Sequence, residues 1–432
     1  MSKFRHLKWL GLATILILLV VGKNYEHALS LYYRTENSAL FRDLFQLNSA
    51  AANGSKPKPF ETQGKGQLQR QVAAYEVLEV SLTASELTRN PYRSGPALAL
   101  TFTGISGAAQ GRSFTTEGFW YGDKTFRARF APPANGEWQW TSVSDDTALH
   151  GKSGIFTCSG TLPAPHASAH GHVRESTTHP YTFAHDDGTP FFLFGDTQWS
   201  FSTAAISWPG EFQAYVDARA AQGFNYIHGV LYQTYPDGNE VNEGGPPFFA
   251  NNVDSLNPGF WQAFDRRLAY FNSKGIVVGL MFAWGDNAWQ LFDTRAQVER
   301  FVQYAVNRYA AYNLFWILAG EYEESTPPGG YELIGNMVHT HDAYHHPTTI
   351  HTVHTSATNF GNAPWQTTIY QQVFHSRQVT PDRVFDKPVV NSEFGYEGDQ
   401  SAEAVRQDAW EIVMRGGFLV YGDTNTFHYD AG

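Results

Sequence analysis

The stretch Asn313–Glu324, NLFWILAGEYEE, decides the fold class because a buried strand in it runs directly into acids. Leu314–Ala319 carries no charge and is predicted to be a core strand, and Glu321, Glu323 and Glu324 follow its carboxyl end. Acidic side chains placed where a parallel strand stops are typical of the active face of an α/β barrel. This stretch therefore predicts a barrel with carboxylates at its mouth.

A second stretch, Lys387–Gly398 (KPVVNSEFGYEG), has the same form. The apolar pair Val389 and Val390 precedes Glu393 and Glu397. Two carboxylates delivered by two barrel strands to one site are the minimum that cleavage of a glycosidic bond requires. Together the two stretches predict a glycoside hydrolase.

Strands and helices alternate through residues 172–432, which predicts a (β/α)8 TIM barrel of the α/β class. The predicted strands are Phe191–Gly195, Asn225–Tyr232, Ile276–Phe282, Leu314–Ala319, Thr348–Val353, Thr367–Phe374, Pro388–Asn391 and Phe418–Tyr421. The predicted helices are Glu211–Gln222, Gly259–Lys274, Arg295–Tyr312, and two more near 329–342 and 402–415. A doubly wound sheet is disfavoured because no glycine-rich phosphate turn follows an early strand. Since the sequence ends just past the eighth strand, we expect a fragment or a barrel that lacks its last helix.

Residues 72–162 form short alternating runs divided by proline and glycine, which predicts an immunoglobulin-like β-sandwich. The aromatic residues of the hairpin Phe126–Trp140 alternate in a way that favours the sandwich core over a sugar-binding face. Residues 24–71 are predicted to be a stalk and linker: apolar residues recur at helical spacing over 24–47, and residues 48–71 have almost nothing to bury.

The composition of the first 23 residues predicts an export signal. The uncharged run Trp9–Gly22 follows Lys3, Arg5 and Lys8, which predicts a cleaved signal peptide or an uncleaved signal anchor. In both cases we expect the catalytic domain outside the cytoplasm: in the periplasm, outside the cell, or anchored in the inner membrane.

Composition limits the classes of ligand and partner that the chain is expected to bind. The net charge of −11 gives no electrostatic footprint for nucleic acid. Cys158 is the only cysteine of the chain, which excludes an intrachain disulfide and a multi-cysteine metal site. The 12 Trp and 22 Tyr residues are more than a core requires and suit stacking on sugar rings. We expect an oligosaccharide or polysaccharide substrate, of plant or microbial origin, and neither a cofactor nor a metal.

The chain resembles the apiosidase-like glycoside hydrolases. The matching motifs are PFFLFGDTQW (190–199), GFNYIHGVL (223–231), NRYAAYNLFWILAGE (307–321) and KPVVNSEFGYE (387–397). Residues 71–162, with FWYGDKTFRARFAPPANGEWQW (119–140), resemble the sandwich domain that often precedes such enzymes. The resemblance implies a barrel of the large retaining glycosidase clan, with Glu321 after the fourth strand as acid/base and Glu393 after the seventh as nucleophile. In one departure, Gly320 stands where clan enzymes usually have the asparagine that contacts the sugar 2-hydroxyl.

Further residues at strand ends are candidates for substrate binding: Asp196, Trp199, Trp284, Asp286, His354 and Glu323. Asp196 is expected to hold a substrate hydroxyl or orient a neighbour, with a helix N-cap as the alternative. Trp199 is expected to be a stacking platform, and strand alternation points Glu323 the same way as Glu321.

Other polar residues follow the fifth and sixth strands. His351 and His354 are three residues apart on the fifth strand, so at most one of them points into the barrel mouth. Gln371 and Gln372 on the sixth strand are candidate hydrogen-bonding partners.

Two other functions remain open at this point. A metal-dependent hydrolase is suggested by the histidines of residues 339–354, namely His339, His341, His345, His346, His351 and His354, together with Asp342. No H-E-x-x-H pair is present, and much of this stretch precedes a strand, at the end of the barrel opposite the active face. A catalytically inactive glycan-binding protein is the other alternative, and the presence of both Glu321 and Glu393 argues against it.

Overall fold

The computed structural model describes residues 70–427 apart from 88–89, 234–240, 286–287 and 375–378. The predicted signal or anchor segment (1–23), nearly all of the predicted stalk and linker, and the end of the chain after Phe427 lie outside the described residues. Within the described ranges, no helix is both long and apolar enough to cross a membrane.

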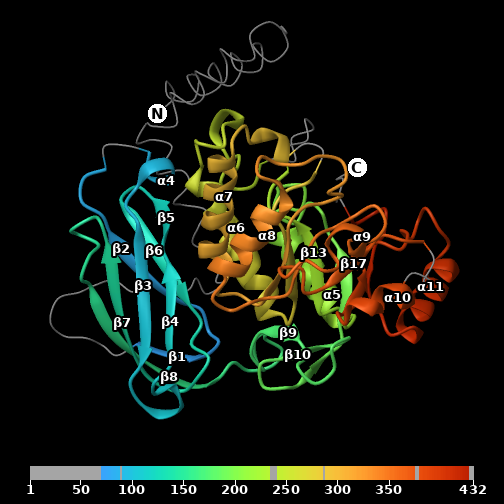
Figure 1. Cartoon of the computed structure of the whole chain (residues 1–432), viewed down its shortest axis with the longest axis horizontal. Helices are drawn as coiled ribbons and strands as arrows, with labels where there is room; N and C mark the ends of the chain where they lie inside the picture. Colours follow the sequence, from blue (N-terminus) through green and yellow to red (C-terminus); the bar gives the residue numbers. More distant parts are fainter. Residues whose placement is uncertain (1–69, 88–89, 234–240, 286–287, 375–378, 428–432) are drawn as a thin grey trace, which may run out of the picture. The chain divides into compact units, whose positions relative to one another are not determined.

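Two sheets form the β-sandwich that the sequence predicts (Figure 1). The larger sheet has the strand order β1-β8-β7-β3-β4 and the smaller one β2-β6-β5. Their bounds are Arg70–Ala74 (β1), Leu78–Thr83 (β2), Leu98–Gly104 (β3), Ser113–Glu117 (β4), Phe119–Gly122 (β5), Thr125–Phe130 (β6), Gly136–Ser144 (β7) and Ser153–Thr161 (β8). The pairings are antiparallel except that of β1 with β8.

Aromatic residues fill the sandwich. Trp138, Trp140 and Phe130 are 0% exposed, and Phe126 is 3% exposed. Phe130 stacks on Phe102 with ring centroids 4.3 Å apart. These side chains are therefore core residues and do not form a sugar-binding face.

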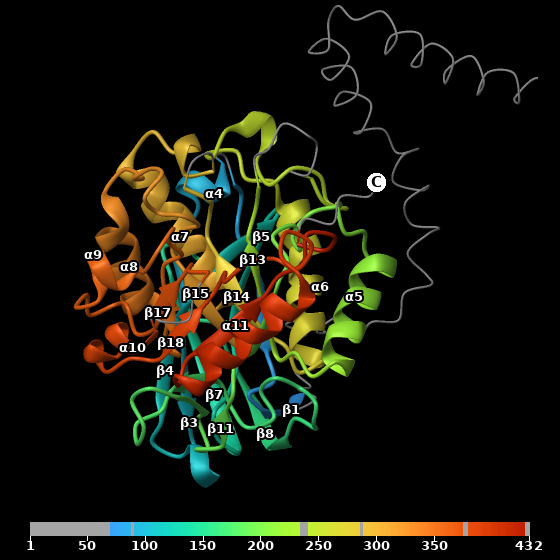
Figure 2. The same cartoon turned by 90° about the vertical axis from the view of Figure 1, so that its right-hand side faces the viewer.

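Eight parallel strands form the sheet of the second region in the order β16-β15-β14-β13-β12-β19-β18-β17, which confirms the TIM barrel (Figure 2). The strands are Phe194–Thr197 (β12), Tyr226–Val230 (β13), Val277–Met281 (β14), Leu314–Ile317 (β15), Thr348–Thr349 (β16), Ile369–Gln371 (β17), Val389–Asn391 (β18) and Phe418–Tyr421 (β19). At the seam between β16 and β17, the backbone N–H groups of Thr367 and Thr368 donate to the carbonyl of Thr348 at 2.9 and 3.3 Å. The sheet is therefore nearly closed.

Helices lie outside the barrel strands (Figure 1, Figure 2). They are Gly210–Ala221 (α5), Pro258–Ser273 (α6), Arg295–Tyr309 (α7), Gly330–His341 (α8), Ala357–Phe360 (α9), Val379–Asp382 (α10) and Ala402–Met414 (α11), and the sandwich adds Pro91–Ser94 (α4). Short 3-10 turns cover Gly107–Ala109, Phe249–Asn251, Trp289–Leu291 and Arg383–Phe385. Helix α7 begins with a capping box of Thr294 and Gln297, and its buried face carries Val298, Phe301 and Val302.

Three strand predictions need correction. Phe191 belongs to a small antiparallel sheet of β9 (Val173–Glu175), β10 (Phe183–His185) and β11 (Pro190–Phe191), where it pairs with Phe183. The first barrel strand is therefore β12, three residues later than predicted. The fifth and sixth strands are shorter than predicted because the chain beyond them leaves the regular ladder to reach the barrel mouth.

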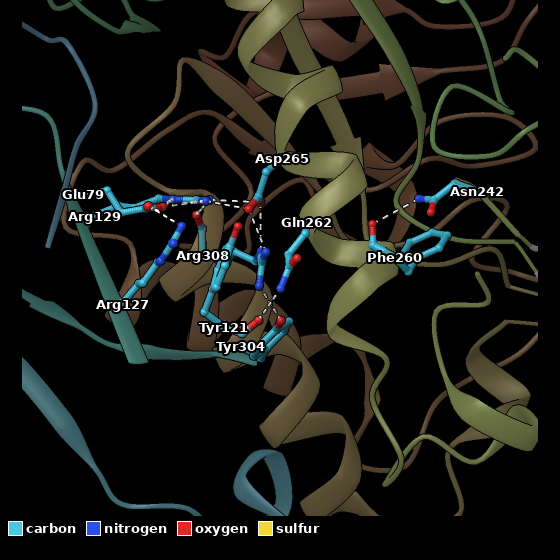
Figure 3. Close-up of polar contacts among 10 residues, drawn as sticks. All are labelled: Glu79, Tyr121, Arg127, Arg129, Asn242, Phe260, Gln262, Asp265, Tyr304 and Arg308. Atoms are coloured by element: carbon cyan, nitrogen blue, oxygen red, sulfur yellow. Dashed lines mark hydrogen bonds and ion pairs between the residues drawn. The ribbon is translucent and has the colours of Figure 1, made fainter. Parts of the chain in front are cut away.

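A buried network of ion pairs joins the sandwich to the barrel (Figure 3). Arg129 of β6 donates to both carboxylate oxygens of Asp265 on α6, at 3.2 and 2.7 Å. Arg308 of α7 donates to the same two oxygens at 2.9 and 2.7 Å. Glu79 of β2 accepts from Arg129 at 3.0 Å and also from Arg127.

Charge compensation explains how this network is tolerated in the interior. The side chains of Arg129, Arg308 and Glu79 are at most 2% exposed. Burial by itself raises the pKa of Asp265, but the guanidinium groups of Arg129 and Arg308 outweigh it and lower the pKa to about 2. Asp265 therefore stays ionised between its two arginines and fixes a strand of the sandwich against two barrel helices.

Candidate active site

Glu321 lies at the carboxyl end of β15 in an unusual backbone conformation. Its φ of +38° is in the left-handed region, which a non-glycine residue adopts only when its neighbours enforce it. Here the flanking residues are held on both sides: Gly320 N–H donates to Ala283 O at 3.1 Å, and Tyr322 N–H donates to His351 O at 3.2 Å. Its carboxylate accepts a hydrogen bond from Gln372 Nε2 at 3.0 Å. Glu321 is thereby fixed in both backbone and side chain.

Glu393 lies two residues beyond β18. The preceding residue, Ser392, donates from both its backbone N–H and its hydroxyl to Gln371 O, at 2.8 and 2.9 Å, which anchors the turn. The Glu393 side chain is 14% exposed. Burial and then the negative charge of Glu393 raise the pKa of Tyr396, and Glu321 adds a smaller effect of the same sign. The Glu393 carboxylate is therefore a neighbour of the Tyr396 hydroxyl.

His351 lies between the Glu393 carboxylate and the backbone of Glu321. Its ring is 0% exposed, with Nε2 3.4 Å from Glu393 Oε2 and Nδ1 3.5 Å from the backbone N–H of Glu321. The structure thus places residues 321 and 393 on either side of one histidine at the carboxyl end of the barrel strands.

Aromatic rings surround this place. Trp199, which follows β12, is 3% exposed and donates from Nε1 to the Tyr396 hydroxyl at 3.1 Å. It stacks on His228 of β13 at 4.5 Å and meets Trp284 edge-on at 5.1 Å. Trp284 is half-buried and donates from Nε1 to Glu324 at 3.1 Å. Trp199 and Trp284 thus form an aromatic corner beside the carboxylates.

Trp284 also explains the glycine that precedes Glu321. A Cβ atom at position 320 would lie 2.3 Å from a carbon of the Trp284 ring. Protein atoms do not approach so closely, and therefore neither alanine nor asparagine fits at this position unless Trp284 moves. Gly320 is required by the packing of the aromatic corner.

Asp196 lies away from this site, so that, of its two predicted roles, its burial speaks against contact with a substrate hydroxyl and leaves the orientation of a neighbour. It is 0% exposed, and its Oδ2 accepts from Arg219 Nε at 2.6 Å and from the Tyr215 hydroxyl, both on α5. The reason is strand alternation: Phe194, two residues earlier on β12, stacks on Phe224 outside the sheet, and Asp196 points the same way. Asp196 binds the barrel to its first helix.

Glu323 is also placed differently from the prediction. Of the two histidines after the fifth strand, His351 points toward the Glu393 carboxylate and His354 is exposed, and substrate binding by His354 stays a prediction. Glu323 does not repeat the direction of Glu321 because β15 ends at Ile317 and no regular alternation reaches residue 323. Its oxygens accept instead from the Thr352 hydroxyl and the Val353 N–H, at 2.5 and 3.2 Å.

The remaining candidates are dispersed. Glu397 accepts from the Tyr421 hydroxyl at 2.8 Å, and Gln371 contacts Asp382. Asp286 lies outside the described residues. Of the histidines in residues 339–354, His341 pairs with Glu117 at 3.5 Å and His346 with Asp342 at 2.9 Å. In the part of the chain that the structure describes, no three His, Cys, Asp or Glu residues are grouped so as to hold a metal ion.

Two residues of the site were missed by sequence reasoning. Tyr396 lies three residues after Glu393 in the motif NSEFGYEG, and a polar aromatic residue so close to a candidate nucleophile was a usable signal. His228 lies inside the buried strand β13, and its Nε2 is 3.0 Å from the Thr197 hydroxyl. Its position in the middle of an apolar strand was the only signal in the sequence that could have marked His228 as a site residue.

A sizeable cavity lies elsewhere, between the sandwich and α7. It has a volume of about 590 Å³ and is lined by Tyr92, Trp120, Arg300 and Gln303, among others. No candidate carboxylate for glycoside cleavage lines it. We place the site at Glu321 and Glu393 because convergent carboxylates, rather than volume, are what the chemistry needs.

The family model described as "Apiosidase-like, catalytic domain" matches residues 177–431, and a domain of unknown function, DUF5060, matches residues 71–145. No curated protein sequence matches significantly.

Solved structures show the same fold. A crystal structure of a Bacteroides vulgatus protein described as a candidate glycoside hydrolase superposes with a TM-score of 0.69 at 22% identity, over 84% of this chain and 75% of that one. A glycoside hydrolase family 5 protein of Bacteroides vulgatus gives a TM-score of 0.53 at 20% identity, over 62% of this chain and 65% of that one.

Proposed function

Because this chain belongs to the apiosidase-like family, it is a glycosidase with a carbohydrate substrate, and we propose that it is a retaining one. We assign Glu393 as the nucleophile and Glu321 as the acid/base. One observation supports this proposal above the others: the His351 ring joins the two stretches that carry the acids, with Nε2 3.4 Å from Glu393 Oε2 and Nδ1 facing the backbone N–H of Glu321.

In the first step, a Glu393 oxygen forms a bond to the anomeric carbon as the bond from that carbon to the leaving oxygen breaks. Glu321 donates its proton to the leaving oxygen, so the departing group is a neutral alcohol. In the second step, water attacks the anomeric carbon and gives a proton to Glu321. The ester bond to Glu393 breaks, and both carboxyl groups return to their starting states. Retention follows from the two inversions.

The surroundings of each carboxyl group suit these roles. His351 and Tyr396 face Glu393, and both can donate hydrogen bonds to a carboxylate nucleophile. Glu321 receives one neutral amide donor, Gln372, on its Oε1. The corner of Trp199 and Trp284 offers ring faces and edges on which the C–H groups of a sugar can pack.

Two variants tested on two substrates examine these assignments. Glu393→Ala should abolish turnover of every substrate, and azide should restore a product of opposite anomeric configuration. Glu321→Ala should slow substrates with poor leaving groups most and an activated aryl glycoside least, because a weakly basic phenolate departs without a proton. Glu397→Gln is the matched control and should keep most of the activity. The proposal is wrong if both alanine variants lose the same factor on both substrates, or less than about tenfold.

The sugar and linkage are to be found by a screen. We propose an oligosaccharide or polysaccharide of plant or microbial origin, and product analysis on a glycan panel identifies it.

We also propose, from the composition of residues 1–23 alone, that the chain is exported or anchored with its catalytic domain outside the cytoplasm. Fractionation of cells that express the full chain tests this, and recovery of all the activity from the cytoplasm would contradict it.

A further inference from the structure

His351 has a place in the site that neither the family match nor the sequence motifs assign. The ring is fully buried, and rings of Trp199, Trp284, His228 and Tyr370 lie within 6.5 Å of it, centroid to centroid. Its backbone is held as well, because its N–H donates to Ala319 O at 3.0 Å. The imidazole plane is therefore fixed, with one nitrogen toward each half of the site.

The two nitrogens have different partners, and this sets the position of the proton. Nδ1 faces the backbone N–H of Glu321 at 3.5 Å, and since that group is a donor, Nδ1 has to be the acceptor. In the neutral ring the proton is then on Nε2. Nε2 lies 3.4 Å from Glu393 Oε2 and makes no hydrogen bond within the described residues. A buried donor without a partner is disfavoured, and the Glu393 carboxylate is positioned to accept.

From this geometry we infer that His351 is a positioning residue that holds Glu393 by its Nε2–H and the backbone of Glu321 by its Nδ1. The inference rests on the proposed roles of these two acids. Both contacts are long in the free protein, as contacts of this kind commonly are before substrate binds. Glu393 and His228 are groups beside the ring that can carry charge. One ring thus sets the relative placement of nucleophile and acid/base.

Two substitutions separate the two contacts. In His351→Asn, the amide ends near the position of Nδ1, so the contact to Glu321 can persist while the donor to Glu393 is lost. In His351→Gln, the longer side chain places its amide near the position of Nε2 and can keep that donor. We expect His351→Asn to lower kcat by about 100-fold, as a nucleophile misplaced by about 1 Å does, with KM changed little. His351→Gln should stay within about tenfold of the wild type.

A double-mutant cycle distinguishes a positioning role of His351 from a merely structural one, because it compares the effect of His351→Asn on the rate with and without the Glu393 carboxylate. In Glu393→Ala, azide replaces the nucleophile, and the Nε2 contact has nothing left to position. His351→Asn should therefore lower the azide-supported rate of Glu393→Ala by less than about threefold, against about 100-fold in the wild-type background. The rates are measured with the 4-nitrophenyl glycoside that the wild type hydrolyses fastest. His339→Gln, an exposed histidine on α8, is the matched control and should stay within about twofold of the wild type.

Each outcome supports or overturns the inference. An equal loss from His351→Asn in both backgrounds would show a structural role and overturn it. If His351→Asn shows no cooperative thermal unfolding, His351→Gln gives the answer, and a loss of about 100-fold in that folded variant overturns the inference. Failure of the proposed function looks different: Glu393→Ala would then stay active or would not respond to azide, whatever stands at position 351.

Discussion

Replacing Asp265 with asparagine should destabilise the whole of residues 70–427, because Asp265 is the acid that both Arg129 and Arg308 share. The carboxylate accepts four charge-assisted contacts between 2.7 and 3.2 Å. Asparagine has the same shape, but one of its two acceptor oxygens becomes an NH2 group that faces guanidinium donors. Arg129 then keeps Glu79 as an acidic partner, whereas Arg308 keeps its hydrogen bond to the Tyr304 hydroxyl.

The expected loss can be worked out in two ways. The pKa of Asp265 falls from an ordinary 3.8 to about 2. A shift of that size is worth about 2 kcal/mol, which is the cost of protonating the carboxyl group in the folded state. Removing the charge and also placing donor against donor should cost about 3–5 kcal/mol, as for other buried pairs that lose one partner. At roughly 2.1 cal/mol/K for each of about 360 residues, this lowers Tm by about 4–7 °C.

Thermal unfolding by calorimetry measures this loss, with Asp217→Asn as the matched control. Asp217 pairs with Lys274 between α5 and α6 at 2.7 Å, but their side chains are 49% and 34% exposed. An exposed pair contributes less than about 1 kcal/mol, so the control should shift Tm by about 1 °C or less. Equal, small shifts for the two variants would refute the reasoning. A single cooperative transition is expected for both, since the network ties the sandwich to the barrel.

Three further predictions concern single residues. Gly320→Ala should lower Tm and weaken activity together, because its Cβ would displace Trp284, and activity assays on the folded variant check this. Asp196→Asn should lower the free energy of unfolding by about 1–3 kcal/mol because it breaks the buried contact with Arg219. KM should change by less than about twofold, and a large increase in KM would show that Asp196 contacts the substrate after all. Burial holds the pKa of His172 well below its ordinary 6.5, so the unfolded chain takes up a proton below pH 6.5 that the folded chain does not. The free energy of unfolding should therefore fall as the pH drops below 6.5. In denaturant titrations at several pH values, His172→Phe should reduce the slope of this free energy against pH by up to about 1.4 kcal/mol per pH unit, and an unchanged slope would contradict this.

The barrel could be predicted from sequence because its strands are short apolar runs that end in acids. Leu314–Ile317 and Val389–Asn391 are fully buried strands, and the chain that follows them carries Glu321 and Glu393. This local pattern is sufficient to locate both acids without knowledge of the partner strands. The sandwich could be predicted for a similar reason, since alternation and turn residues are local signals.

The direction of a side chain just beyond a strand could not be predicted in the same way. Asp196 was misplaced because the direction of a side chain depends on the residue at which its strand starts and stops. Glu321 itself has φ +38°, which breaks the alternation that sequence reasoning extended to Glu323. The network of Arg129 and Asp265 spans 136 residues of sequence, and no local pattern links its members.

Trapping of the covalent intermediate tests the central claim most directly. A 2-deoxy-2-fluoro glycosyl fluoride of the sugar that the enzyme cleaves slows hydrolysis of the ester more than its formation, so the labelled enzyme accumulates. Mass spectrometry of its peptides should find one sugar, on Glu393 within Lys387–Gly398, and the label should be absent from Glu393→Ala. A label on another acid, or an inverted first product with no trapped sugar, would contradict the assignment of Glu393 as the nucleophile of a retaining enzyme.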